Sequence, residues 1–185
     1  MADFLPITTT LINNLKVEIR EALRDDFEPD SRFDEFYQWH ISAGKHMRRE
    51  YNLANRESFK KHFRQRIKEK ENIILGAFHK EKIIGIAQLS FDLDNNKIKH
   101  VGSWGVVIHP DFQNKGLGKS FIQTIEKIAL NMGIKKLESS VYEPNSPAKH
   151  LYIDKLGYIV EGVKKCAAFI DNQYVNEILI AKFLK

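Results

Sequence analysis

Cysteine is almost missing from this sequence, since Cys166 is the only one among 185 residues. A single cysteine excludes a disulfide bond within the chain and is consistent with a reducing cytoplasm. Long apolar runs are missing too, because no stretch approaches the roughly 20 apolar residues that cross a bilayer. The N-terminal stretch MADFLPITTTLINNLK also lacks the basic and apolar regions of a secretion signal. We therefore expect a cytoplasmic protein with no membrane partner.

The usual signatures of a metal site are also missing. The seven histidines form no His-Glu-x-x-His motif, and Cys166 stands alone, so the sequence predicts no metal. It offers no Cys–His pair for nucleophilic catalysis either. Glycine- and serine-rich linkers, internal repeats and low-complexity tracts are missing as well. We therefore expect one domain over residues 1–185.

Neither sign of charge dominates the composition, because the sequence has 29 basic and 24 acidic residues. The net charge is +5 and the pI is near 9.2. The most basic stretch, residues 60–70, falls where Phe59, Phe63 and Ile67 recur at helical spacing. Such a stretch could contact nucleic acid, but a solvated helix face is the commoner explanation. We therefore expect no nucleic-acid partner.

Apolar periodicity divides the chain into alternating strands and helices. Strands are predicted at residues 16–21, 73–79, 83–91, 98–108, 137–141, 158–163 and 175–183. Helices are predicted within residues 25–51, from residue 55, at 117–132 and at 147–156. Gly133 and Gly157 follow the last two helices and are candidates for left-handed caps. The order predicts an α/β fold whose strands at 73–108 pair antiparallel.

The stretch VVIHPDFQNKGLGKS, residues 106–120, joins a β-branched strand to an amphipathic helix through a glycine loop. A Walker A loop needs glycine where Gln113 stands, and a dinucleotide-binding loop needs a third glycine where Phe121 stands. The pattern that remains is Q-x-x-G-x-G. Backbone N–H groups at such a helix start can hold a pyrophosphate, and lysines add positive charge. The predicted anion-binding residues are Gln113, Asn114, Lys115, Gly116, Leu117, Gly118 and Lys119.

This loop and a second segment together resemble the GNAT superfamily of acetyl-CoA-dependent N-acetyltransferases. The family signature (Q/R)-x-x-G-x-(G/A) lies between a central strand and a helix, as it does here at residues 113–118. Residues 145–162, NSPAKHLYIDKLGYIVEG, look like the family segment in which Asn, Ala and Leu-Tyr precede Gly-(Phe/Tyr). The resemblance extends over about residues 16–183, with its motif core at about 98–163. The stretches at 109–119 and 171–177 resemble the branch that acetylates free amino acids and small amines.

The resemblance implies a fold, a cosubstrate and residue roles. The fold would be a central, mostly antiparallel sheet with a splayed parallel strand pair, flanked by helices, and the cosubstrate would be acetyl-CoA. Main-chain groups of Val106, Val107 and Ile108 would bond the pantetheine arm, with an oxyanion hole at Val107 or Ile108. Asn145 would hold a pantetheine amide or cap a helix. Tyr152 would be the catalytic proton donor to the CoA sulfur.

The general base is where the sequence departs from the family. Many members carry a glutamate on the strand before the loop, but residues 103–108, SWGVVI, have no carboxylate. At pH 7 an amine of pKa ~10.4 is neutral in about one molecule in 2,500, and an α-amine of pKa ~7.7–8.0 in roughly one in ten. We therefore hypothesise an α-amine acceptor whose proton is relayed by water or by a distant group. Candidates for that group are Glu35, His100 and Glu138.

Taken together, these patterns predict an N-acetyltransferase that moves an acetyl group from acetyl-CoA to a primary amine of a small molecule. An amino acid is one candidate acceptor. Two alternatives stay open at this point: a protein or peptide Nα-acetyltransferase with an open acceptor groove, and a non-catalytic CoA-binding module. The family-level expectation for assembly is a monomer or a homodimer.

Overall fold

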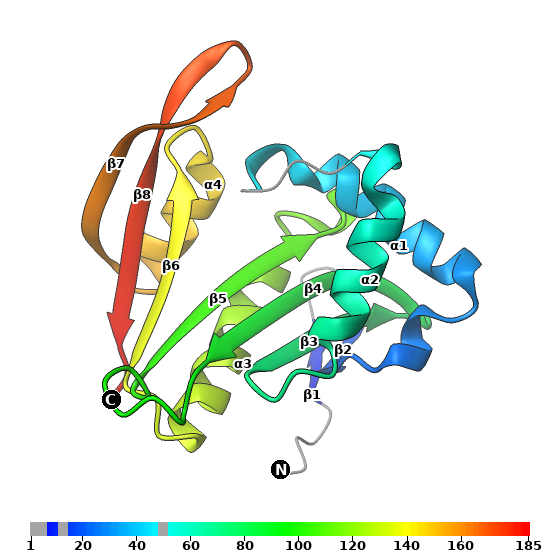
Figure 1. Ribbon diagram of the computed structural model, residues 1–185, viewed down its shortest axis with the longest axis horizontal. Coiled ribbons are helices and arrows are strands. Elements are labelled where there is room, and N and C mark those ends of the chain that lie inside the picture. Colours follow the sequence, from blue (N-terminus) through cyan, green and yellow to red (C-terminus); the bar gives the residue numbers. More distant parts are fainter. Residues whose placement is uncertain (1–6, 11–14, 48–51) are drawn as a thin grey trace.

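The computed structural model describes residues 7–10, 15–47 and 52–185, which form an eight-stranded sheet with helices on both faces (Figure 1). The strands are β1 (Ile7–Thr10), β2 (Lys16–Glu21), β3 (Asn72–His79), β4 (Lys82–Phe91), β5 (Val101–Ile108), β6 (Lys136–Tyr142), β7 (Ile159–Ile170) and β8 (Gln173–Phe183). The main helices are α1 (Asp30–Ala43), α2 (Arg56–Arg66), α3 (Leu117–Asn131) and α4 (Ser146–Lys149). Within these described ranges, no helix has the length and apolar character needed to span a membrane.

The sheet has the strand order β1-β2-β3-β4-β5-β6-β8-β7, and its one parallel pair in the described part of the chain is β5 with β6. This parallel pairing covers only residues 101–103 of β5 and 136–138 of β6. Both strands then continue, to Ile108 and Tyr142, while they diverge from each other (Figure 1). Main-chain N–H and C=O groups on the facing edges therefore border a gap in the sheet. The mostly antiparallel sheet with a splayed parallel pair is confirmed.

Two hydrophobic cores lie on opposite faces of the sheet. Leu117, Phe121 and Ile125 of α3 are fully buried against one face, as the apolar helical spacing predicts. Helices α1 and α2 cover the other face with a cluster rich in phenylalanine. Strand β5 alternates between the two cores, since Val106 packs with the first and Val107 with the second. Burial on both faces fixes the register of β5, and therefore the position of its open end.

Local hydrogen bonds explain where the elements depart from the predicted boundaries. Strand β5 starts at Val101 instead of residue 98, because the N–H groups of Ile98 and Lys99 both bond to the Asn95 carbonyl in a turn. The predicted helix at 147–156 divides into α4 and a π-helical turn, η5 (His150–Lys155). In that turn the Leu156 N–H bonds to the Leu151 carbonyl, five residues back, at 3.0 Å. Strand β1 has no counterpart among the predicted strands.

His40 lies inside the aromatic core beneath α1. Its side chain is 5% exposed, and its ring centre lies 5.2, 6.0 and 4.9 Å from those of Phe36, Trp39 and Phe59. Apolar surroundings disfavour the charged imidazolium, so burial lowers the pKa of His40 to about 4.

This burial predicts a loss of stability in mild acid. The ordinary pKa of 6.5 applies to the unfolded chain, so His40 contributes fully above pH 6.5 and less as the pH falls towards 4. The difference corresponds to roughly 3 kcal/mol of unfolding free energy. We expect His40→Phe to flatten the pH dependence of urea unfolding between pH 6.5 and 4 relative to the wild type. Parallel curves for the two proteins would contradict this assignment.

Candidate functional site

The glycine loop lies at the open end of β5 and leads into α3. The side chain of Gln113 donates from Nε2 to the Ile108 carbonyl at 3.1 Å, which fastens the loop to the strand. Asn114 and Gly116 have φ angles of 57° and 82°, in the left-handed region. Asparagine and glycine are the residues that adopt this conformation at the lowest cost. The sequence thus places both residue types where the backbone reverses.

The start of α3 presents unused donors to this loop. The first intrahelical bond runs from the Ser120 N–H to the Gly116 carbonyl at 3.1 Å, so the N–H groups of residues 117–119 precede it. These groups and the positive end of the helix dipole favour an anion. There is little room for a side chain at position 118 of the helix start. A Cβ on Gly118 would lie 3.2 Å from Leu151 Cδ2 and 3.4 Å from Ile108 Cδ1.

A cavity of about 350 Å³, here called the loop cavity, lies beside this helix start. Its lining contains ten of the twelve predicted site residues: Val106, Val107, Ile108, Gln113, Asn114, Gly116, Gly118, Lys119, Asn145 and Tyr152. The other two predicted residues lie apart from it. Lys115 places its Nζ 5.3 Å from the centre of the Phe112 ring, and the Leu117 side chain is 1% exposed in the α3 core. Leu117 can therefore serve the loop through its N–H group alone.

The hydrogen-bonding pattern of β5 decides which of its main-chain groups face the gap. The His109 N–H bonds to Ile84 on the β4 side, whereas the Trp104 carbonyl accepts from Ser139 Oγ of β6 at 2.8 Å. Alternate residues of a strand direct their groups to opposite neighbours. Val107 therefore faces β4, while Val106 and Ile108 face the gap. Of the two oxyanion-hole candidates, the geometry supports Ile108 and not Val107.

Tyr152 lies on the π-helical turn η5 and packs against the core on the α3 face of the sheet. Its ring meets Trp104 edge to face, with ring centres 4.9 Å apart and planes at 90°. Burial raises the pKa of Tyr152 to about 12, so its hydroxyl stays protonated at neutral pH. Asn145 caps α4, since its Oδ1 accepts from the Ala148 N–H at 3.4 Å. The structure thus combines a protonated phenol with a capped helix start at one end of the gap.

A second cavity of about 500 Å³, here called the sheet cavity, opens from the first on the face covered by α1 and α2. The two cavities share Tyr152, Asn145, Val106, Val107, His46 and Met47. Gly105 of β5 also lines the sheet cavity, and a Cβ there would meet nothing within 4 Å. A small ligand in the sheet cavity would therefore meet Tyr152 beside a ligand in the loop cavity.

The sheet cavity contains a carboxylate that the sequence reasoning missed. Glu177 of β8 is 5% exposed and lines the cavity. Ser140 Oγ donates to its Oε1 at 2.7 Å, and Lys164 Nζ lies 3.2 Å from its Oε2. The signal was available, because Glu177 stands at an inward position of a strand, two residues after the buried Val175.

None of the three general-base candidates from the sequence lines either cavity. Glu35 is exposed on α1 and pairs with Lys82 at 2.8 Å. Glu138 pairs with Lys136 at 2.7 Å. His100 lies in the turn before β5, where its carbonyl accepts from the Lys135 and Lys136 N–H groups. Among the residues described, no three His, Cys, Asp or Glu side chains gather in a way that could hold a metal ion.

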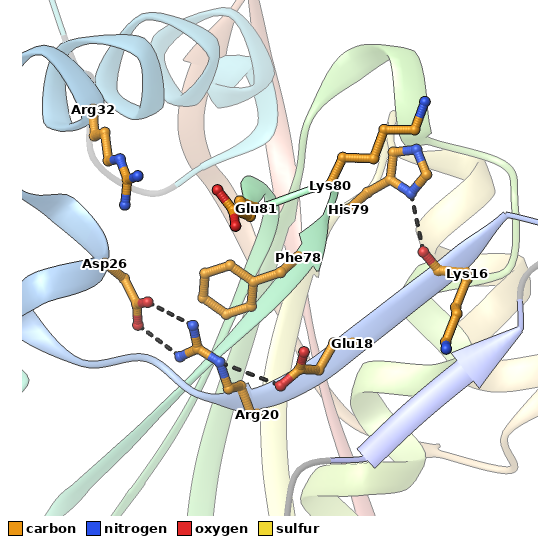
Figure 2. Close-up of a pocket in the computed structure, with 9 residues that line it drawn as sticks. All are labelled: Lys16, Glu18, Arg20, Asp26, Arg32, Phe78, His79, Lys80 and Glu81. Atoms are coloured by element: carbon orange, nitrogen blue, oxygen red, sulfur yellow. Dashed lines mark hydrogen bonds and ion pairs between the residues drawn. The ribbon is translucent and has the colours of Figure 1, made fainter.

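A separate charged cavity lies where β2 and β3 meet η1 (Arg24–Phe27), and Figure 2 shows Arg20 in it paired with Asp26 and Glu18. Arg20 donates to both Asp26 oxygens at 2.7 and 2.6 Å, and its guanidinium carbon lies 3.8 Å from the centre of the Phe78 ring. The Asp26 contact raises the pKa of Arg20. This cavity shares no described lining residue with the loop or sheet cavity. Its ion pairs anchor η1 to the sheet.

Comparison with solved structures finds the same fold in bacterial acetyltransferases. A GNAT-family acetyltransferase from Streptococcus pneumoniae is 24% identical, with 91% of this chain and 99% of that chain aligned at a TM-score of 0.69. A GCN5-related N-acetyltransferase from Kribbella flavida is 18% identical, covering 91% and 98% at 0.73. The ribosomal-protein-S18-alanine N-acetyltransferase of Escherichia coli is 15% identical, covering 91% and 94% at 0.68.

The family model described as the acetyltransferase (GNAT) family matches residues 17–158, which include the glycine loop, the gap between β5 and β6, and the turn that carries Tyr152. Members of this family use acetyl-CoA as a cosubstrate. The chain therefore belongs to the GNAT family of acetyltransferases.

Proposed function

We propose that the protein is an N-acetyltransferase that transfers the acetyl group of acetyl-CoA to a primary amine of a small molecule. The observation that carries the proposal is the position of Tyr152 where the loop cavity meets the sheet cavity. Acetyl-CoA in the loop cavity would place its diphosphate at the N–H groups of residues 114–119, beside Lys119. An amine in the sheet cavity would then approach the thioester from the α1 and α2 face.

The gap between β5 and β6 offers main-chain partners for the pantetheine arm. Val106 and Ile108 direct main-chain groups into it, so the arm can bond to β5 as a neighbouring strand would. The Ile108 N–H is the donor we assign to the developing oxyanion. Asn145 holds the entry of α4 beside this path.

The chemistry requires the acceptor to lose two protons as its ammonium becomes an amide. The first goes to solvent, which frees the nitrogen lone pair. As the C–N bond forms and the C–S bond breaks, Tyr152 donates its hydroxyl proton to the departing sulfur and recovers one from the nitrogen. The thiolate formed from a thiol of pKa ~8.5 is a weaker base than a phenolate, so full proton transfer from Tyr152 is uphill and hydrogen bonding to sulfur contributes most of the stabilisation.

A peptide acceptor is the second candidate, and one feature favours it. The sheet cavity shares Met47, Tyr142 and Glu177 with a further cavity of about 890 Å³ beneath the β7–β8 hairpin. An extended acceptor could follow this series of cavities. The Escherichia coli neighbour named above is an N-acetyltransferase of a ribosomal protein, but at 15% identity it supports the fold alone. We favour the small-molecule acceptor because polar groups held in place by hydrogen bonds, such as Glu177, line the same cavity as Tyr152.

An acceptor panel tests the proposal. Purified protein is incubated with acetyl-CoA and, at equal concentrations, free amino acids, diamines or tetrapeptides with free N-termini. Thiol release and the mass of the acetylated product are measured together. We expect product with small amines. Product from the tetrapeptides alone would favour the peptide candidate, and acetyl-CoA binding without product from any amine would favour a non-catalytic CoA-binding module.

Gly105 provides a test of the acceptor position. We expect Gly105→Leu to raise the acceptor KM by roughly three- to tenfold, because the leucine would occupy space in the sheet cavity. Gly105→Ala should fall between it and the wild type. Acetyl-CoA binding, measured by calorimetry, should change little in both variants. A larger effect on acetyl-CoA than on the acceptor would place the acceptor elsewhere.

A further inference from the structure

Two opposite charges lie on either side of the gap between β5 and β6. Arg66, at the end of α2, donates to Gln88 of β4 at 3.0 Å. Glu177 belongs to β8, on the far side of β6. Both residues line the sheet cavity. Because the strand order is β4-β5-β6-β8, a ligand lying across the gap has a cation on one side and an anion on the other.

The position of Arg66 is fixed by a network on β3 and β4. Gln88 Nε2 donates to Asn72 Oδ1 at 2.7 Å and to Ser90 Oγ at 2.6 Å, which turns the Gln88 amide oxygen towards Arg66. Within the described residues, this bond to Gln88 is the one polar contact of the Arg66 guanidinium. A guanidinium has five N–H donors in a planar fork that matches a carboxylate. Arg66 is therefore oriented and able to bind an anionic group.

The role of Glu177 follows from its charge and its place at the cavity wall. An ionised carboxylate attracts an ammonium group and accepts hydrogen bonds from its N–H groups. Ser140 and Lys164 hold the carboxylate in place at the cavity wall, and the Lys164 side chain is 50% exposed. Glu177 is thus suited to hold the acceptor amine close to the gap before water takes its proton.

We propose that the acceptor is a free α-amino acid, with its ammonium on the Glu177 side and its carboxylate at Arg66. The inference rests on the proposed N-acetyltransferase function and names its substrate class. A peptide N-terminus has no adjacent carboxylate for Arg66, and a diamine would bring a second cation to it. Phe59 and Phe63 of α2 also line the cavity, so an apolar side chain on the amino acid has a wall to pack against.

Matched pairs of acceptors test this directly. The probes are glycine, L-leucine and L-phenylalanine, each compared with its carboxamide, together with 1,4-diaminobutane. We expect the wild type to favour the acids at least tenfold in kcat/KM. The amides have lower amine pKa values and are the readier nucleophiles, so intrinsic reactivity cannot produce this preference. Equal or better use of the amides or the diamine would overturn the proposal.

Variants separate recognition from structure. Arg66→Met should lower kcat/KM for the acids at least tenfold and so abolish their preference over the amides. Glu177→Gln should raise the KM of acid and amide alike, at constant KM for acetyl-CoA. Lys164→Met is the control, because it breaks the same ion pair but keeps the carboxylate, so its acceptor KM should rise less than that of Glu177→Gln. Equal losses in Glu177→Gln and Lys164→Met would make the carboxylate structural. If Glu177→Gln does not fold, the comparison of acids with amides in Arg66→Met still tests the proposal, because Arg66 is exposed.

A binding measurement distinguishes failure of the inference from failure of the proposed function. L-phenylalanine and L-phenylalaninamide are titrated into the protein saturated with CoA, and heat is recorded. Binding of the acid without turnover of any amine would support the amino-acid site and contradict the proposed N-acetyltransferase function. Turnover of amines without preferential binding of the acid would preserve the enzyme and overturn the site.

Discussion

Tyr152→Phe is expected to lower kcat by roughly ten- to hundredfold, because it removes the hydroxyl that donates to the departing sulfur. The phenylalanine ring can keep its edge-to-face contact with Trp104, so the wall of the cavity should persist. Acetyl-CoA binding, measured by calorimetry, should therefore change little. The lower end of the range applies if the thiolate needs only a hydrogen bond.

The matched control is Tyr158→Phe. Tyr158 also meets Trp104 edge to face, with ring centres 5.3 Å apart, but it is 1% exposed and lines neither cavity. Its loss should leave kcat near the wild-type value. The kcat of the wild type should also show no decline due to Tyr152 between pH 7 and 10, because burial raises the pKa of Tyr152 to about 12. Unaltered turnover in Tyr152→Phe would remove its assigned role.

Gly116→Ala is expected to weaken acetyl-CoA binding by about five- to thirtyfold. Gly116 has a φ of 82°, and an L-residue in this left-handed conformation costs about 1–2 kcal/mol. The loop can relieve this strain by moving its N–H groups away from the diphosphate. Restoring the binding geometry then costs the same free energy, and 1.4 kcal/mol corresponds to a factor of ten in affinity.

Gly133→Ala is the control that separates weaker acetyl-CoA binding from the general effect of backbone strain. Gly133 has a φ of 81° at the other end of α3, and a Cβ at either glycine would meet nothing within 4 Å. Gly133→Ala should lose about 1–2 kcal/mol of unfolding free energy for the same backbone reason, and Gly116→Ala should lose less because its loop relaxes. Calorimetry should then find weaker acetyl-CoA binding in Gly116→Ala alone. Equal affinities in the two variants would show that the loop does not hold the cosubstrate.

Local patterns in the sequence were sufficient for most of the fold. Helix α3 was predictable because its apolar residues repeat at 3.6 and a left-handed glycine follows it. The hairpin β3–β4 was predictable from two apolar runs around a short charged turn. The division of the predicted helix at 147–156 was not, because the π-helical turn is built on hydrogen bonds that span five residues, such as the one from the Leu156 N–H to the Leu151 carbonyl. Such a bond leaves no periodic signature.

Some residues of the candidate site were likewise predictable from the sequence, and others were not. The glycine loop and Tyr152 were found from the sequence because their spacing along the chain is itself the signal. Glu177, Arg66 and Gly105 were not, since they come from β8, α2 and β5 and meet only at the sheet cavity. The family pattern places a carboxylate on the strand before the loop, whereas the structure brings one to the cavity from two strands away.

The sequence by itself determined the glycine loop, the tyrosine motif and the alternation of strands and helices, because each depends on residues that are neighbours along the chain. Only the tertiary structure decided which main-chain groups face the gap, and which charges border the cavity beside Tyr152. The physical reason is that strand pairing sets these positions. The ladder between β5 and β6 stops after residues 103 and 138, and the strand order places β8 beside β6.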